Sequence, residues 1–205
     1  IKTKHLIFAS TSSVYGDSNK FPLKETQDTS KPLTLYAASK KTNEVLAYSY
    51  SNIYNLPITA LRFFTVYGPY GRPDMALFKF TKAITEDNYL ELYNSGNHYR
   101  DFTYIDDVVK SIYKLIKKPS KNKIPFDIYN LASSKTVYLK KYLKIIETFL
   151  SKKAKIKNLK FQIGDVKKTH ASIFKLEKKI GKIKITKLDD GIRKFLLWYK
   201  MYYKK

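Results

Sequence analysis

A tyrosine and a lysine stand four residues apart, at Tyr36 and Lys40, downstream of the hydroxyl cluster Ser10-Thr11-Ser12-Ser13. On a helix, positions i and i+4 lie on one face, so the phenol and the ammonium can reach the same substrate atom or cofactor ribose. A free tyrosine has a pKa near ~10, and it acts as a base near neutral pH only when about 4 kcal/mol of differential stabilisation lowers that pKa by roughly three units. A neighbouring lysine and a cationic cofactor ring can supply this stabilisation. The pair is a candidate acid/base device, although the same spacing also arises by chance in a chain with 18 Tyr and 40 Lys and Arg.

The sequence around this pair has the pattern of a βαβ unit. A short apolar run at residues 4–9 precedes the hydroxyl cluster, and a β-branched and aromatic run at residues 58–64 follows the helix of Tyr36. The second run ends at a Gly- and Pro-rich segment, residues 66–73, which we expect to be a loop. Ligands of open α/β sheets bind at the carboxyl ends of the strands, so the hydroxyl cluster is predicted to lie at the binding edge.

Further elements alternate along the rest of the chain. Apolar periodicity predicts helices at residues 75–86, 106–118, 139–150 and 189–203, and short strands at residues 90–93 and 126–131. No internal repeat and no clear linker is visible in the sequence. A second lobe would therefore be built from segments interleaved with the first.

Composition limits the class of protein. The chain has 205 residues, 43% of them hydrophobic, and no apolar run of about 18 residues that would span a membrane. It has no Cys, and its three histidines show no metal-ligand spacing, so we expect an intracellular protein without a bound metal. The net charge of +23 also suggests a nucleic-acid binder, but the lysines are spread along the chain without a dense stripe, so we expect no nucleic-acid partner.

Four segments resemble, in order and spacing, the extended short-chain dehydrogenase/reductase family and within it the nucleotide-sugar 4-epimerases. The segments are residues 8–16 (FASTSSVYG), 36–40 (YAASK), 62–69 (RFFTVYGP) and 100–107 (RDFTYIDD). The loop at residues 68–76 is most similar to UDP-glucuronate 4-epimerases, including enzymes of bacterial capsule and lipopolysaccharide synthesis. The resemblance implies an α/β fold, the C-terminal part of a Rossmann-like parallel sheet with an interleaved smaller α/β substrate-binding lobe.

The resemblance also implies a division of the chain and a missing part. Rossmann strands and helices are expected mainly within residues 1–72 and 99–132, and the substrate lobe mainly within residues 73–98 and 133–205. The Gly-rich turn that holds the NAD pyrophosphate in this family does not occur among the seven glycines. We therefore expect the chain to be the C-terminal part of a longer epimerase and to be inactive alone. The full-length enzyme is expected to be a cytoplasmic homodimer.

The catalytic and cofactor residues follow from the resemblance. It implies that Tyr36, as phenolate, removes the proton of the sugar 4-hydroxyl while hydride passes to NAD. Thr11 would hydrogen-bond that hydroxyl, and Lys40 would bind the nicotinamide ribose and lower the pKa of the tyrosine. The implied cofactor-binding residues are Ser10, Tyr36, Lys40, Phe63, Phe64 and Val66. For the Phe pair, an ordinary core position is an equally good interpretation.

The substrate implied is a UDP-sugar, and the residues expected to bind it are Thr11, Ser12, Ser13, Thr65, Arg72, Ala76, Leu77, Tyr93 and Arg100. Related 4,6-dehydratases place Asp and Glu after the threonine, whereas two serines suit a sugar carboxylate. Ser12 and Ser13 could instead only cap free backbone groups at the strand end. The alternatives left open are a UDP-glucose or other UDP-hexose 4-epimerase, another nucleotide-sugar enzyme of the family, a non-catalytic fragment, and a basic nucleic-acid-binding module.

Overall fold

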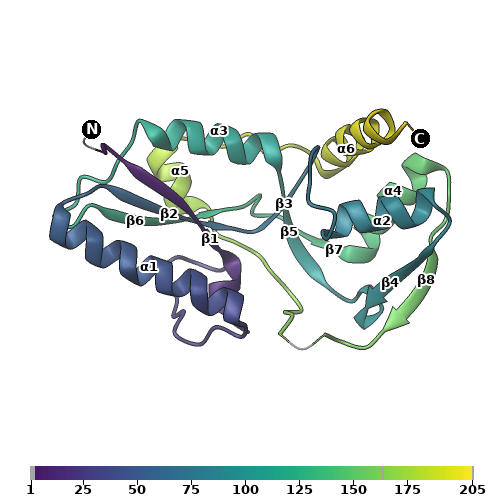
Figure 1. Ribbon diagram of the computed structural model, residues 1–205, viewed down its shortest axis with the longest axis horizontal. Helices are drawn as coiled ribbons and strands as arrows, with labels where there is room; N and C mark the ends of the chain where they lie inside the picture. Colours follow the sequence, from purple (N-terminus) through teal and green to yellow (C-terminus); the bar gives the residue numbers. More distant parts are fainter. Residues whose placement is uncertain (1–2, 163, 205) are drawn as a thin grey trace.

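The computed structural model of the protein describes residues 3–162 and 164–204. Two parts, each with its own helices, flank a small sheet in the middle of the molecule (Figure 1). One part is a parallel sheet with α1 on one face and α3 and α5 on the other, and the second part contains α2, α4, α6 and the strand pair β4-β8. The predicted α/β class is confirmed.

The main sheet consists of three parallel strands in the order β1 (Leu6–Thr11), β2 (Ile58–Phe63) and β6 (Phe126–Leu131). Their register brings the last residue of each strand into one row, Thr11 beside Phe63 beside Leu131. Strand β1 begins two residues later than expected and includes Ser10 and Thr11. The first hydroxyls of the cluster are therefore fixed by strand pairing.

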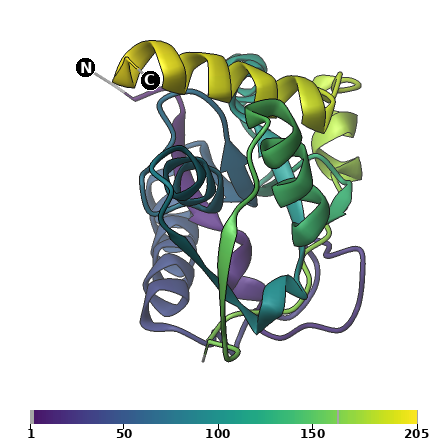
Figure 2. The same ribbon diagram turned by 90° about the vertical axis from the view of Figure 1, so that its right-hand side faces the viewer.

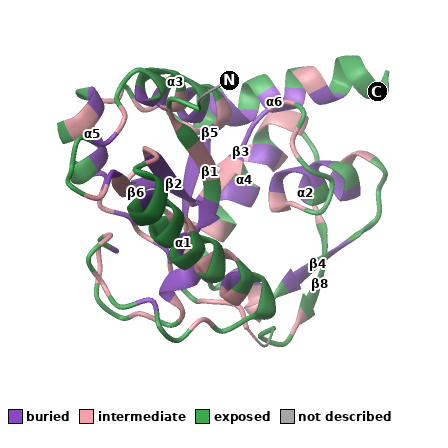
Figure 3. Ribbon diagram, turned by 60° about the vertical axis from the view of Figure 1, so that its left-hand side comes forward, coloured by how far each residue is buried: buried purple, intermediate pink, exposed green. Residues whose placement is uncertain are grey.

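The helix that carries Tyr36 is α1 (Leu35–Tyr54). It begins at Thr34, whose hydroxyl accepts a hydrogen bond from the Ala37 amide at 3.1 Å, and it ends at Asn55 in the left-handed conformation (φ 49°). Threonine is a favoured N-cap, and Asn tolerates the left-handed region at a helix end. The helix has 20 residues, and those buried within it are Ala37, Glu44 and Ser51, so most of its surface is exposed (Figure 3).

The middle sheet was not expected from the sequence. It pairs β3 (Thr65–Tyr67) with β5 (Tyr99–Tyr104) in parallel and β5 with β7 (Thr136–Tyr138) antiparallel. The interpretation of residues 66–73 as a loop from its first residue was wrong, because the loop starts only after Tyr67. Parallel pairing with β5, more than 30 residues away in sequence, holds Thr65–Tyr67 in an extended conformation despite the Gly and Pro that follow.

The second part has an aromatic core. Its elements are α2 (Ala76–Thr85), β4 (Tyr89–Tyr93), the 3-10 turn η2 (Asn94–Gly96), α4 (Leu139–Leu150), β8 (Lys155–Leu159) and α6 (Leu188–Tyr203). Figure 2 shows α6 running along the top of this part, above α4. Phe102 and Tyr142 stack with ring centroids 4.1 Å apart, and Tyr67 meets both rings edge-on. Such pairs contribute about 0.5–1.5 kcal/mol beyond their buried area.

The remaining helices return to the main sheet. Helix α3 (Ile105–Ile116) has two acidic residues in its first turn, which suit the positive end of a helix, and α5 (Phe174–Ile180) packs beside it on β6. Among the described residues, no helix combines the length and apolar character needed to cross a membrane. Within the same residues no cluster of three His, Asp or Glu side chains is arranged to hold a metal ion.

A buried carboxylate holds two connecting segments against the middle sheet. Asp101 of β5 is fully buried and accepts hydrogen bonds from the Ser133 amide (2.9 Å), the Ser133 hydroxyl (2.7 Å) and the Ala171 amide (3.1 Å). Burial raises the pKa of Asp101 although these donors oppose the shift. One side chain thus fixes the loop after β6 and the segment before α5 against β5.

We expect Asp101→Asn to lower the free energy of unfolding by about 1–3 kcal/mol, because the new NH₂ group would face a buried donor and leave it unpaired. The exposed Asp28, which accepts from the Ser30 amide, provides the control, and Asp28→Asn should change stability by less than about 0.5 kcal/mol. Urea denaturation of the three proteins measures both values. Equal stabilities would show that Asp101 does not hold the loops.

Candidate functional site

Tyr36 and Lys40 lie on the first turns of α1, beside the carboxyl end of β1. The Lys40 ammonium donates a hydrogen bond to the Ala9 carbonyl at 3.0 Å, so this side chain reaches from the helix to the strand. Tyr36 is 55% exposed, which leaves its phenol open to a ligand. The predicted pair is therefore on one helical face at the edge of the sheet where α/β proteins bind ligands.

The hydroxyl cluster continues from β1 into a short 3-10 helix, η1 (Ser12–Tyr15). Thr11 is the residue that caps this turn, since its hydroxyl oxygen accepts from the Ser13 amide at 3.2 Å. The Thr11 hydroxyl also donates to the Ser13 hydroxyl at 3.2 Å. Among the described residues, neither the Ser12 nor the Ser13 hydroxyl donates to a backbone carbonyl. The capping role considered for the two serines is performed by Thr11.

Four of the predicted substrate residues line one cavity of about 160 Å³: Ser12, Ser13, Thr65 and Arg100. They come from η1, β3 and β5, three elements that are far apart in the sequence. The cavity is also lined by polar residues that the sequence did not single out, namely Thr34, Asp165, Lys168 and Thr169. Hydroxyl donors and cations make this lining suitable for an anionic, oxygen-rich ligand.

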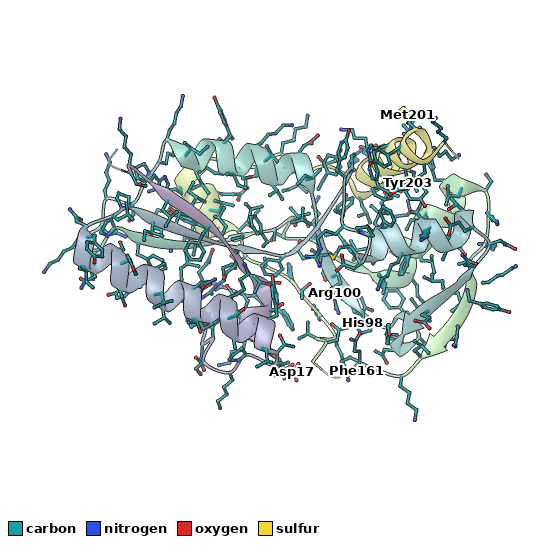
Figure 4. All side chains as sticks on the ribbon, viewed as in Figure 1. Asp17, His98, Arg100, Phe161, Met201 and Tyr203 are labelled. Carbon is teal, nitrogen blue, oxygen red and sulfur yellow. The ribbon has the colours of Figure 1, made fainter. Side chains whose placement is uncertain are left out.

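Arg100 is held in place by a carboxylate. Its guanidinium donates to Asp165 at 2.7 Å and to the Tyr99 carbonyl at 3.1 Å, and His98 Nε2 lies 3.2 Å from the second Asp165 oxygen. Figure 4 shows Arg100 and His98 near the segment that carries Phe161, whose ring stacks on that of His98. Burial lowers the pKa of Arg100, and Asp165 partly offsets this effect. Burial and the Arg100 charge also lower the pKa of His98, which favours its neutral form.

A second, smaller pocket shares Thr65 with the cavity and is lined by four further predicted residues, Val66, Arg72, Ala76 and Leu77. Arg72 is exposed and forms a two-point ion pair with Asp74. Tyr93, at the end of β4, is 39% exposed and is not among the residues that line either pocket.

The predicted cofactor residues other than Tyr36 and Lys40 are mostly core residues in this structure. Phe64 is buried against Val14 and Tyr15. Phe63 and Val66 are partly buried and pack against the hydrophobic cluster beneath α3. This agrees with the core interpretation of the Phe pair. The Ser10 hydroxyl donates to Glu44 at 2.6 Å, so a cofactor contact by Ser10 would have to come from its backbone.

Glu44 and Arg62 form a buried ion pair that the sequence analysis missed. Arg62 Nε and Nη2 donate to the two Glu44 oxygens at 2.9 and 2.8 Å, and both side chains are 2% exposed. Burial alone would raise the pKa of Glu44, but the hydrogen bonds and charge of Arg62 outweigh it, so the pKa lies below its ordinary value. Two signals could have revealed the pair: an Arg inside the apolar run of β2, and a Glu one turn beyond Lys40.

Comparison with known proteins identifies the family. The NAD dependent epimerase/dehydratase family matches residues 1–132, and the chain belongs to this family. Protein CapI of Staphylococcus aureus is 47% identical over 98% of the chain, which covers 65% of CapI. A probable UDP-glucuronate 4-epimerase of Rhizobium meliloti is 40% identical over the whole chain, which covers 64% of that protein.

The fold agrees with the sequence relatives. The crystal structure of UDP-glucuronic acid 4-epimerase from Bacillus cereus, solved with UDP-glucuronic acid and NAD, superimposes with a TM-score of 0.91 and 32% identity. The match covers 99% of this chain and 63% of the Bacillus protein. The chain thus spans slightly less than two thirds of the length of these relatives, and its fold is that of the Rossmann-like nucleotide-sugar epimerases.

The depressed pKa of Glu44 predicts how stability depends on pH. A carboxylate whose pKa is lower in the folded state stabilises the fold above its unfolded pKa of about 4.3, and this stabilisation disappears as pH falls through the folded pKa. We expect Glu44→Gln to be less stable than the parent chain at pH 7. The difference between the two stabilities should shrink as pH falls below the unfolded pKa and through the lowered pKa of Glu44 in the folded protein.

Unfolding curves measured between pH 3 and 7 give this difference directly. The matched control is Glu91→Gln, because Glu91 is exposed and lies 4.0 Å from Lys157. Exposed pairs contribute little, so this variant should follow the parent at every pH. A difference in the free energy of unfolding between Glu44→Gln and the parent that stays the same at all pH values would contradict a lowered pKa of Glu44.

Proposed function

We propose that the full-length protein, meaning the product of the whole coding sequence that contains these residues, is an NAD-dependent epimerase that inverts C4 of UDP-glucuronate. The observation that carries the proposal is the cavity that brings Ser12, Ser13, Thr65 and Arg100 together at the carboxyl ends of β1 and β2, the edge to which α1 brings Tyr36 and Lys40. Family membership and the relatives named as UDP-glucuronate 4-epimerases support the same reaction.

The lining of the cavity supports a carboxylate at sugar C5. The hydroxyl groups of Ser12, Ser13 and Thr65 can donate to this carboxylate. Among the described residues, those of Ser12 and Ser13 donate to no backbone carbonyl. Charge-assisted hydrogen bonds to a carboxylate are stronger than those to a neutral hydroxyl. Positions 12 and 13 carry no carboxylic acid, whereas elimination of water from the sugar requires an acid and a base. Arg100 is suited to the diphosphate, and Arg72 offers a second cation beside the neighbouring pocket.

The acid/base step belongs to Tyr36. Its exposed side chain, as phenolate, removes the proton of the sugar 4-hydroxyl and, as phenol, later returns it, while Thr11 hydrogen-bonds the same hydroxyl. Lys40 holds the nicotinamide ribose, and its position one helical turn from Tyr36 fits that role. Bound NAD would supply the acceptor for the hydride that leaves C4 of the sugar. Once the 4-keto sugar has turned over in the pocket, the hydride would return to the opposite face of C4.

The remaining parts of the proposal come from the resemblance. Residues 1–72 and 99–132 would contribute mainly to the NAD-binding domain, and residues 73–98 and 133–205 mainly to the UDP-sugar lobe, with Ala76, Leu77 and Tyr93 near the nucleotide. These 205 residues contain no Gly-rich pyrophosphate turn, so turnover is expected of the full-length protein and not of this chain alone. The full-length enzyme is proposed to be a cytoplasmic homodimer.

Substitution of Tyr36 separates acid/base chemistry from packing. Tyr36→Phe removes one oxygen, so the full-length variant should fold normally while kcat falls by about 10²-fold or more. Tyr50 is a matched control, since it lies on the same helix and is 56% exposed. Tyr50→Phe should keep the parental kcat. An unchanged kcat in Tyr36→Phe would rule out Tyr36 as the base.

Substrate preference tests the carboxylate assignment. Hydrogen bonds to a charged acceptor contribute about 1.5–3 kcal/mol, against about 0.5–1.5 kcal/mol for neutral ones, so kcat/KM should favour UDP-glucuronate over UDP-glucose by about 10²-fold or more. Replacing Ser12 and Ser13 together by Ala should reduce this ratio, chiefly by slowing the glucuronate reaction. The exposed Ser49→Ala serves as control and should leave the ratio unchanged. A parent enzyme that turns over both sugars equally would favour a UDP-hexose 4-epimerase.

A further inference from the structure

A row of buried polar side chains crosses the main sheet one residue before its carboxyl edge. Strand pairing aligns Ser10 of β1 with Arg62 of β2 and Arg62 with Asn130 of β6. In-register residues of parallel strands point to the same face, and these three are 2%, 1% and 0% exposed. Polar groups buried inside a sheet are unfavourable unless partners satisfy them. The row therefore needs other elements to close over it.

Two elements close over Arg62, while Asn130 also donates to the carbonyls of Leu23 and Ser172. Glu44 of α1 takes two hydrogen bonds from the guanidinium and one from Ser10. Tyr15, at the end of η1, places its ring 4.8 Å from the guanidinium carbon and donates its hydroxyl to Asn130 at 2.7 Å. Arg62 contacts both closing elements, since it donates to Glu44 of α1 and lies over the Tyr15 ring of η1.

The contact with Glu44 determines where α1 lies. Glu44 is four residues from Lys40 and eight from Tyr36, so all three side chains are on one face of the helix. Besides Glu44, the residues that α1 buries are the small Ala37 and Ser51, which provide little apolar area to fix the helix. A two-point Arg–carboxylate bond has a defined geometry, so it restrains both the rotation of α1 and its position along its axis.

The contact with Tyr15 determines where η1 lies. This turn is only four residues long, and it begins with Ser12 and Ser13, which line the cavity. Its last residue packs on Arg62 and is bonded to β6. The side chain of Arg62 thus lies between the helix with the acid/base pair and the turn with the substrate hydroxyls.

We propose that Arg62 is a positioning residue for the reaction. Through Glu44 it fixes the position of Tyr36 and Lys40, and through Tyr15 it fixes the position of Ser12 and Ser13. This inference rests on the proposed epimerase function. A buried ion pair is not required for stability, because apolar residues of similar size often stabilise a fold equally well. A misplacement of about 1 Å at a catalytic group can reduce the rate about 10²-fold.

The decisive variant is Arg62→Lys in the full-length protein. Lysine keeps the positive charge opposite Glu44 but cannot make two parallel bonds to it. We expect kcat to fall about 10- to 100-fold while KM for the UDP-sugar changes less than about threefold. If Arg62 only balances the charge of Glu44, the lysine variant would keep the parental kcat, and this result would overturn the proposal.

A charge-free pair and a matched control separate positioning from stability. Arg62→Met combined with Glu44→Leu removes both buried charges, so the fold should be retained while kcat stays low. A parental kcat in this variant would also overturn the proposal.

Asp107→Asn is the control, since Asp107 is a carboxylate that is 4% exposed and binds Thr186 away from α1. It should lower the melting temperature without lowering kcat, and an equal kcat loss in this control would count against a specific role of Arg62.

An NMR measurement keeps this inference distinct from the proposed function. In the folded full-length protein, Arg62→Lys should shift the ring signals of labelled Tyr36 and the amide signals of Ser12 and Ser13 together, and Asp107→Asn should shift neither set. Absence of epimerase turnover in the parent would refute the proposed function alone, and the NMR result would still decide whether Arg62 positions both elements. Unshifted signals in Arg62→Lys would overturn the inference whatever the activity.

Discussion

Buried carboxylates that accept several hydrogen bonds hold this fold together. Glu44 fixes α1 to β2, Asp101 fixes two loops to β5, and Asp107 accepts from both the amide and the hydroxyl of Thr186. The half-buried Glu25 and Glu177 each accept from one backbone amide, that of Asn130 and that of Ile183 respectively. Long irregular connections leave amide groups that need acceptors, and an ionised carboxylate accepts from several at once. The chain has 17 acidic residues against 40 Lys and Arg, and several of those few acids are used inside.

These anchors explain how an interleaved architecture remains ordered. The chain passes from the main sheet to the second part and back, so neither part is continuous in sequence. The middle sheet joins β3 from one passage with β5 and β7 from later ones. Thr65, at the start of β3, lines both pockets for this reason. The cavity is therefore made at the junction of the two parts, where small polar side chains from several passages meet.

The sequence predicted elements whose signal is local and missed those that depend on remote partners. Apolar periodicity located α2, α3, α4 and α6 to within about two residues, because a helix satisfies its own backbone. Strands β3, β5 and β8 lack a strong pattern and form only because distant segments pair with them. The same limit applies to the site. Motifs identified Ser12, Ser13 and Arg100, whereas Asp165 and Lys168 come to the cavity from a segment without a recognisable pattern.

Charge balance at the cavity bears on how an anionic sugar would be selected. Arg100 is already neutralised in part by Asp165, and the Lys168 ammonium lies 4.7 Å from the centre of the Phe21 ring. Net charge alone would therefore discriminate poorly between a sugar carboxylate and a hydroxymethyl group. Directional hydroxyl donors can do so, because their hydrogen bonds to an ionised oxygen are stronger than those to a neutral one. Under the proposed function, selection of this kind would depend on the orientation of the four-residue turn η1, so the packing of its last residue, Tyr15, against Arg62 would matter as much as the serines themselves.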